Sequence, residues 1–360
     1  MISISLCMIV KNEEQCLQNC LNSVKEIADE IIIVDTGSTD NTVEIAKKYT
    51  NNIYFFHWIN DFSAARNFSF SFASKEYILW LDADDVLLDE DIKKFKNLKI
   101  NLDKSIDYVG MMYDYSFNKN GECIYSFRRN RLIKNNKGYY WDCFMHEKLN
   151  VWGTQEDYDI HITHTRKHDN NPKYIENFKK RIEAGFQLNP RECFYYGGEL
   201  FCGGYYDECI KILEDFLSKN YDGVYELQRT LNYLAEAYYI KKDYKKALEY
   251  FYKAFLYDLP NEEVCYRIGN CFQELKRYEE AIFWYKIVTN QEFPVNSLCK
   301  KDTEWKHYLP HQQLCVCYFY LGQCELANKY NNIALKYIPN DEIALANKRY
   351  FISVGIDEEE

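Results

Sequence analysis

The stretch from Tyr77 to Asp85 constrains the fold more than any other part of the sequence. Five apolar or aromatic residues are followed directly by Asp-Ala-Asp-Asp, which contains three carboxylates. A continuous apolar run is typical of a strand buried on both faces, and open α/β sheets bind ligands just beyond the carboxyl ends of such strands. The two-residue period of a strand predicts Asp82 and Asp84 on one side of the chain and Asp85 on the other. Converging carboxylates suit Mg²⁺ or Mn²⁺ and a diphosphate, although a solvated acidic turn would look the same.

Three further apolar runs precede this stretch and alternate with helical periodicity. Buried strands are expected at 2–10, 30–34 and 53–58, and helices near 17–27, 42–49 and 62–74. This alternation favours parallel strands joined by right-handed crossovers, which is a Rossmann-like sheet. No G-x-G-x-x-G follows the first strand. A dinucleotide cofactor is therefore not expected, and a nucleotide held by carboxylates and a metal ion fits better.

The pattern changes in the next part of the chain. Short aromatic segments at 109–115, 123–128 and 139–141 are separated by turns that contain Asn and Gly. Such segments predict an antiparallel extension packed beside the parallel sheet.

The period becomes helical after an Asn-Pro junction near residue 171. Small residues recur at a spacing of 34, with Ala235 followed by Gly269 and Ala247 followed by Ala281. This spacing favours tetratricopeptide-like repeats over a plain helical bundle, with a further copy after an insertion at 290–301. We therefore expect an α/β domain over residues 1–170 and an all-α repeat domain over 171–355, which would present a concave surface.

Composition excludes several classes of protein. The formal net charge of −11 argues against a nucleic-acid groove, which needs clustered Lys and Arg. No apolar run approaches the roughly 18 residues of a membrane span. The 14 Cys are scattered without a C-x-x-C pair, and the first residues do not resemble a signal peptide. The cysteines are therefore interpreted as reduced thiols of a cytoplasmic protein.

Four motifs, in this order, resemble the family 2 glycosyltransferases, which have the GT-A fold. They are CMIVKNEE at 7–14, IVDTGSTD at 33–40, ARN at 65–67 and LDADD at 81–85. Looser matches continue through FRRN at 127–130, His146-Glu147 and His164. A helical-repeat tail on such an enzyme resembles the bacterial glycosyltransferases that modify peptides and proteins, including the bacteriocin peptide S- and O-glycosyltransferases.

The resemblance implies a binding site for a nucleotide sugar. Asp35 resembles the family's carboxylate that contacts the nucleobase or ribose, with turn capping as the alternative. Asn12 and Glu13 should line the same pocket. Arg66 lies where the family has an Arg near the nucleotide, although pairing with Asp35 or Asp82 as structural support is equally compatible. Asp82 resembles the first carboxylate of the family's D-x-D motif, near the ribose.

The resemblance also implies a metal site. Asp84 resembles the metal-binding carboxylate of the D-x-D motif, and His164 resembles a later His that completes the site around Mn²⁺ or Mg²⁺. His161 and His168 are competing candidates, and a His on a strand is more often structural.

Glu147 is the candidate general base, with His146 as the alternative. A base on the acceptor side would take the proton from the incoming group while the anomeric carbon is attacked from the opposite face, which predicts inversion. Arg128, Arg129 and Arg131 could touch the diphosphate or the acceptor, or lie on a solvated strand edge.

Taken together, these features predict a metal-dependent inverting glycosyltransferase. It would move one sugar from a UDP-sugar, UDP-glucose or UDP-N-acetylglucosamine, to a Ser/Thr oxygen or Cys sulfur of a peptide or protein. The repeat domain would hold the acceptor and is a candidate surface for a homodimer. The alternatives are a glycosyltransferase that acts on a cell-surface saccharide and a helical-repeat scaffold without catalysis.

Overall fold

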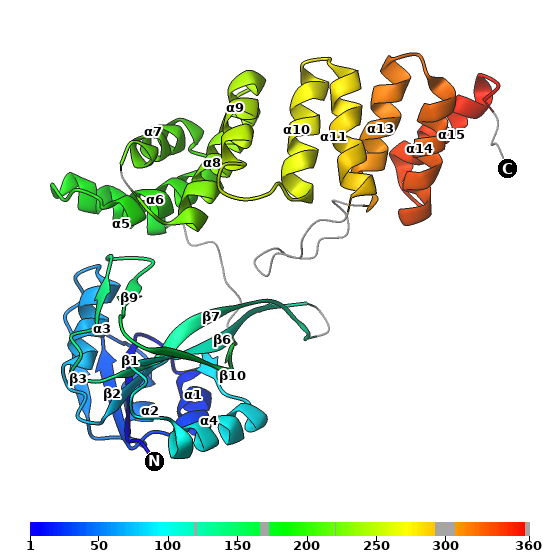
Figure 1. The fold of residues 1–360 in the computed structure, drawn as a ribbon. Helices are drawn as coiled ribbons and strands as arrows, with labels where there is room; N and C mark the ends of the chain where they lie inside the picture. Colours follow the sequence, from blue (N-terminus) through cyan, green and yellow to red (C-terminus); the bar gives the residue numbers. More distant parts are fainter. Residues whose placement is uncertain (119–120, 166–172, 220, 292–306, 357–360) are drawn as a thin grey trace. The chain divides into compact units, whose positions relative to one another are not determined.

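The computed structural model describes residues 1–118, 121–165, 173–219, 221–291 and 307–356. They form two compact units, an α/β unit that ends with β10 and a helical unit that begins with α5 (Figure 1). The predicted fold class, an α/β domain followed by an all-α repeat domain, is confirmed. The predicted boundary at residue 170, the candidate His168 and most of the expected insertion lie outside the described residues.

The α/β unit is built on an eight-stranded sheet of order β3-β2-β1-β4-β7-β6-β10-β5. The strands are β1 (Ile4–Val10), β2 (Glu30–Asp35), β3 (Ile53–Phe55), β4 (Tyr77–Trp80), β5 (Asp85–Val86), β6 (Tyr108–Phe117), β7 (Cys123–Lys134) and β10 (Gln155–His164). β1 to β4 pair in parallel, as predicted. The expected extension joins through β7, which is antiparallel to both β4 and β6, whereas β10 runs parallel to β6.

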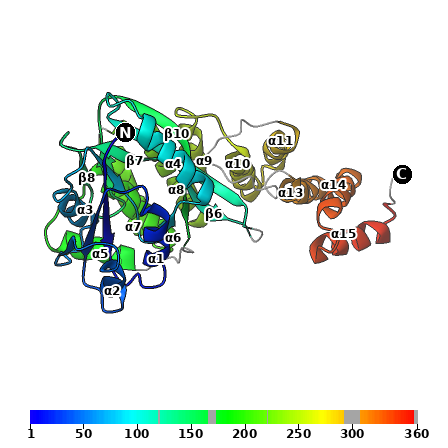
Figure 2. The same ribbon diagram turned by 90° about the horizontal axis from the view of Figure 1, so that it is seen from below.

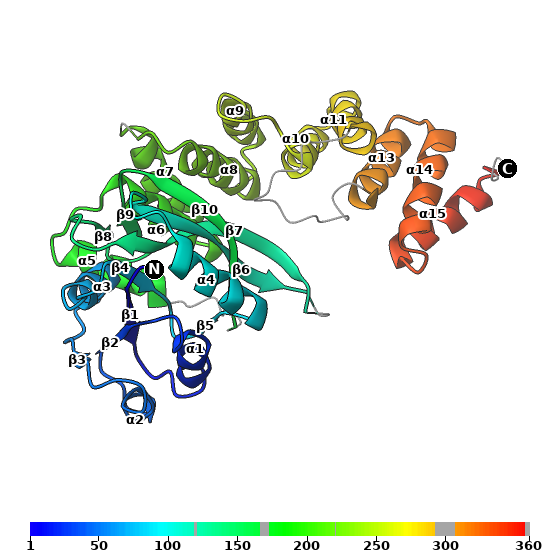
Figure 3. The same ribbon diagram turned by 60° about the horizontal axis from the view of Figure 1, so that its bottom comes forward.

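Helices cover both faces of this sheet (Figures 2 and 3). They are α1 (Leu17–Val24), α2 (Thr42–Ala46), α3 (Phe62–Phe70) and α4 (Asp89–Asn101), and a small hairpin is formed by β8 (Tyr140–Asp142) and β9 (Lys148–Asn150). Alternate residues of β1 face two separate apolar clusters, because successive side chains of a strand point to opposite faces. Leu6 and Met8 pack with α1 and α4, whereas Cys7 packs with Trp80 and with Trp141 of β8.

The helical unit consists of paired helices joined by tight turns. They are α5 (Lys173–Glu183), α6 (Pro190–Cys202), α7 (Tyr206–Leu217), α8 (Val224–Ile240), α9 (Tyr244–Ala254), α10 (Glu262–Glu274), α11 (Tyr278–Asn290), α13 (Leu309–Tyr320), α14 (Cys324–Tyr337) and α15 (Glu342–Ser353). The two helices of a pair approach each other closely, which explains why a small residue recurs in the repeats. A Cβ atom on Gly269 would lie 2.5 Å from the ring of Tyr285, and one on Gly197 would lie 2.1 Å from Leu213.

Among the described residues, no helix is both long enough and apolar enough to cross a membrane.

Candidate active site

The D-x-D segment follows β4 as a turn rather than as a continuation of the strand. β4 ends at Trp80, and the backbone N–H of Asp82 donates a hydrogen bond of 3.0 Å to Oδ2 of Asp85. The strand period therefore stops applying before the first carboxylate. The prediction that Asp85 points away from Asp84 is wrong, because the turn brings these two carboxylates together and directs Asp82 elsewhere.

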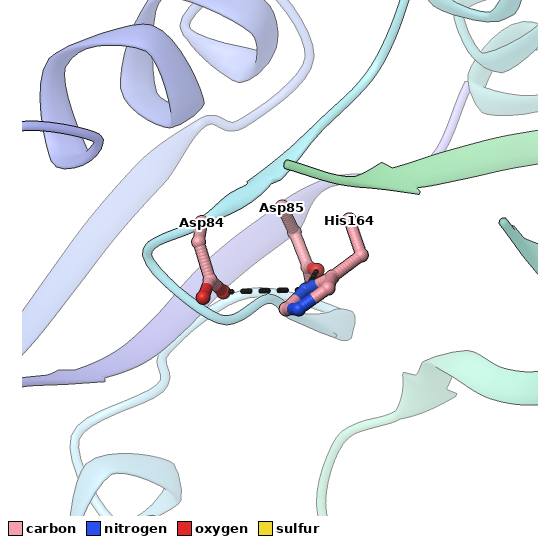
Figure 4. A group of neighbouring side chains, drawn as sticks. All are labelled: Asp84, Asp85 and His164. Carbon is pink, nitrogen blue, oxygen red and sulfur yellow. Dashed lines mark ion pairs between the residues drawn. The ribbon is translucent and has the colours of Figure 1, made fainter. Parts of the chain in front are cut away.

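Asp84, Asp85 and His164 form a buried cluster at the junction of β5 and β10 (Figure 4). One potential ligand atom from each residue lies within 4.8 Å of the other two. Backbone pairing places His164 directly opposite Asp85. The buried hydroxyl of Tyr113 lies 2.9 Å from Nδ1 of His164 and fixes the orientation of the ring. The structure thus brings together the two residues predicted to bind metal and adds Asp85.

The donor set of this cluster fits a divalent cation. The Oδ2 atom of Asp85 pairs with Nη1 of Arg131 at 2.9 Å, and both side chains are fully buried. Its Oδ1 atom lies 3.6 Å from Nδ1 of His164 but has no hydrogen-bond partner among the described residues. A buried carboxylate oxygen without a hydrogen bond is costly, and a cation would satisfy it. Carboxylate oxygens combined with an imidazole nitrogen suit ions such as Mn²⁺.

Arg66 of α3 connects two of the predicted site residues. Its Nη2 donates to Asp82 at 2.6 Å and its Nε donates to Glu147 at 2.8 Å. The guanidinium lies over the rings of Trp80 and Trp141, at 5.1 and 4.8 Å from their centroids. Of the two carboxylates considered as structural partners of Arg66, the structure shows Asp82 and not Asp35, whereas a contact of Arg66 with a nucleotide stays a prediction.

The positive charges of nearby arginines hold Asp82 in its ionised form. Burial alone would raise the pKa of Asp82, but the charges of Arg66 and Arg131, with the hydrogen bond from Arg66, lower that pKa well below its usual range. The carboxylate is therefore negative at any physiological pH.

The loop that carries His146 and Glu147 is anchored to α3. The side-chain amide of Asn67 both donates to and accepts from the backbone of Trp141, at 2.9 and 2.8 Å. The backbone N–H of Phe62 donates to the carbonyl of Phe144 at 2.9 Å. His146 is half-buried and adopts a left-handed backbone conformation (φ 52°). Its turn directs Glu147 towards Arg66.

The candidate nucleoside residues lie at the carboxyl ends of β1 and β2. The Asp35 carboxylate accepts hydrogen bonds from the backbone N–H groups of Gly37 and Ser38, so the capping role is observed. The side-chain oxygen of Asn12 accepts from the N–H of Thr39 at 2.7 Å. The backbone N–H of Glu13, on the same loop, donates to the hydroxyl of Thr42. These hydrogen bonds connect the loop after β1 with the loop after β2. In the sheet, β1 lies between β2 and β4, so the loop after β1 is adjacent to the end of β4.

His161 lies outside the metal cluster. Its Nδ1 contacts Asp114 at 3.0 Å and its Nε2 contacts Asp159 at 3.2 Å. Burial alone would lower the pKa of His161, but the hydrogen bond to Asp114 raises it. We therefore interpret His161 as part of a local ion-pair group on β6 and β10.

Several residues of the site were missed by sequence reasoning. Tyr113, Trp80 and Trp141 carried no motif signal, because aromatic residues at such positions usually fill cores. Arg131 was recognised only as one of three arginines in the segment FRRNR. Its position at an irregularity of the β6–β7 pairing, between Val109 and Gly110 on the partner strand, is invisible in the sequence.

The comparisons with known proteins agree with this division of the chain. The family described as Glycosyl transferase family 2 matches residues 5–148, and the family described as Tetratricopeptide repeat matches residues 262–287. The latter match covers α10 and most of α11, in one of the copies predicted from the 34-residue spacing.

Similar proteins include a glycosyltransferase and a TPR repeat-containing protein. The chain is 29% identical over 226 residues to the SPbeta prophage-derived glycosyltransferase SunS of Bacillus subtilis, covering 59% of this chain and 52% of that protein. It is 42% identical over 104 residues to a TPR repeat-containing protein of Synechococcus elongatus, covering 29% of this chain and 25% of that protein. The match to the crystal structure of MamA covers 50% of this chain and 89% of the MamA chain, with 16% identity and a TM-score of 0.36.

These curated relatives are thus matched over about half of their length or less. The motifs, the mixed sheet and the family match agree on the N-terminal unit. This unit therefore carries the motifs and the family match of a family 2 glycosyltransferase domain, and the chain continues into a helical region that contains a match to the Tetratricopeptide repeat family.

Proposed function

We propose that this chain is a metal-dependent inverting glycosyltransferase that transfers one sugar from a UDP-sugar to a peptide or protein side chain. The observation that carries the proposal is the double ion pair of Arg66. It joins Asp82 of the D-x-D turn to Glu147, the candidate base, in the same site as the Asp84 cluster. The relative named glycosyltransferase SunS supports the reaction class.

The donor would occupy the carboxyl edge of the sheet. Asp35, Asn12 and Glu13 would line the nucleoside part of the site, and Asp82 would lie near the ribose. Asp84 and His164, with Asp85, would hold Mn²⁺ or Mg²⁺. The bound ion would offset the charge of the departing diphosphate.

The chain's own residues account for the proton transfer. The acceptor oxygen or sulfur forms a bond to the anomeric carbon while the bond from that carbon to the diphosphate breaks, and the electron pair leaves with UDP. Glu147, oriented by Arg66, takes the acceptor's proton, with His146 as the competing base. Attack from the face opposite the leaving group inverts the anomeric centre.

The helical unit is the proposed acceptor-binding part of the chain. Helical repeats present extended concave surfaces that suit a peptide or protein segment. The same unit is the proposed place for a homodimer contact. UDP-glucose and UDP-N-acetylglucosamine are the proposed donors.

A thermal-unfolding screen tests the donor site. The full chain is heated with UDP-, GDP-, CDP- and dTDP-sugars, each with and without Mn²⁺. A ligand that binds the folded state raises the melting temperature by mass action, by several degrees at concentrations far above its Kd. We expect this rise with a UDP-sugar and only in the presence of Mn²⁺. No rise with any nucleotide sugar would refute the proposal and favour the scaffold without catalysis.

A further inference from the structure

Three arginines follow closely on β7, and the structure gives each a different environment. Arg128 is exposed, with its Nε 3.3 Å from Asp157. Arg131 is fully buried and pairs with Asp85. Arg129 is half-buried, and no described residue provides a carboxylate or other hydrogen-bond partner for its guanidinium. One positive charge of the three is thus left without a counter-ion.

The guanidinium of Arg129 is held against the active site by aromatic rings. It lies 5.6 Å from the ring centroid of Trp80 and 5.3 Å from that of Tyr113. Trp80 ends β4 immediately before the D-x-D turn, and the hydroxyl of Tyr113 contacts His164 of the metal cluster. Contacts with aromatic faces position a guanidinium without neutralising its charge.

The nearby carboxylates do not compensate this charge fully. Asp82 and Glu147 favour the charged form of Arg129, but both already accept hydrogen bonds from Arg66. Burial and the like charge of Arg131 lower the pKa of Arg129. An arginine nevertheless stays protonated in proteins, so its uncompensated charge costs free energy until an anion binds.

We propose that Arg129 binds the diphosphate of the donor nucleotide and stabilises the negative charge that develops there. The planar fork of a guanidinium matches two phosphate oxygens, which explains why an arginine suits this position. When the bond between the anomeric carbon and the diphosphate oxygen breaks, the electron pair remains on that oxygen. Arg129 keeps its protons and pairs with the new charge, while the acceptor's proton goes to Glu147. This assignment rests on the proposed function, because it uses the same donor.

The experiment compares Arg129→Met with Arg128→Met in the full chain. Arg128 is a matched control, since it is the adjacent arginine on the same strand and its charge is paired outside the site. The dissociation constants of UDP and UMP are measured by calorimetry with Mn²⁺ present. We expect Arg129→Met to weaken UDP binding roughly 10- to 100-fold, the loss of a charge-assisted contact. Its preference for UDP over UMP should fall, and Arg128→Met should change neither constant.

Arg129→Lys provides a second measurement if the Met variant does not fold. It keeps the charge but loses the fork, so its affinity for UDP should lie below that of the wild type. Wild-type affinity for UDP in a folded Arg129→Met or Arg129→Lys variant would overturn the assignment and leave the proposed function standing. A wild-type protein that binds none of UDP, GDP, CDP and dTDP would overturn both.

Discussion

Two neighbouring regions at the carboxyl edge of the sheet satisfy their polar groups in opposite ways. In the loops after β1 and β2, the side chains of Asp35 and Asn12 bond to backbone N–H groups a few residues away or on the adjoining loop. Around the D-x-D turn, Oδ1 of Asp85 and the guanidinium of Arg129 have no hydrogen-bond partner among the described residues. In the first region, these side chains form their hydrogen bonds within the protein. In the second region, charged groups without a hydrogen-bond partner remain to bind ligands.

The largest expected effect comes from Glu147, the proposed base, which pairs with Arg66 in the second region. Glu147→Gln preserves the shape of the side chain but removes the carboxylate that is proposed to take the proton. We expect the turnover rate to fall by a factor of about 100 to 10,000, with the affinity for UDP nearly unchanged. Product formation and UDP binding are measured on the same preparation. Turnover equal to that of the wild type would rule out Glu147 as the base and favour His146.

The buried pair of Arg131 and Asp85 should give the largest effect on stability. Arg131→Met leaves the carboxylate of Asp85 buried without its cation, which typically costs about 3–5 kcal/mol. Urea unfolding measures the loss, with Arg128→Met as the control, for which less than about 1 kcal/mol is expected. Added Mn²⁺ should recover part of the loss if Asp85 helps to hold the ion. An unfolding free energy equal to that of the control would contradict this interpretation.

The pH dependence of stability tests the charges around Asp82. Its pKa is lowered in the folded state, so the unfolded chain binds more protons on this group as the pH falls. The contribution of Asp82 to the free energy of unfolding is fully present above its pKa in the unfolded chain, about 3.9. This contribution is lost as the pH falls towards the pKa of Asp82 in the folded protein. Asp82→Asn should flatten the acid limb by at most about 1.4 kcal/mol per pH unit. Parallel acid limbs for wild type and variant would show that Asp82 is not the titrating group.

The smallest effect is expected at Asp35, in the region whose polar groups are already satisfied. Asp35→Asn retains an oxygen that can accept from Gly37 and Ser38, so the unfolding free energy should change by less than about 1 kcal/mol. If the carboxylate also contacts the nucleoside, the affinity for UDP should fall about tenfold. Calorimetry decides between the two roles, because unchanged affinity would leave Asp35 with capping alone.

Local patterns were sufficient to predict the fold class, whereas the candidate site residues came from the family resemblance and stay predictions. Apolar runs located the parallel strands, and the 34-residue spacing of small residues located the paired helices, because Gly269 must admit the ring of Tyr285. The failure at Asp85 has a local cause as well. The strand period was extended two residues or more past Trp80, where hydrogen bonding within the turn replaces the pleat.

The order of strands and helices along the chain, the repeat period and the types of polar residue available for chemistry all follow from the amino-acid pattern. The pairing of those residues depends on the three-dimensional fold. Arg66 and Glu147 are 81 positions apart, and no local periodicity relates them. Three arginines within four positions of β7 look alike in sequence, yet one meets Asp157, one meets Asp85 and one meets only aromatic rings. A charge finds its partner through the packing of distant strands, so its role depends on contacts that sequence spacing does not specify.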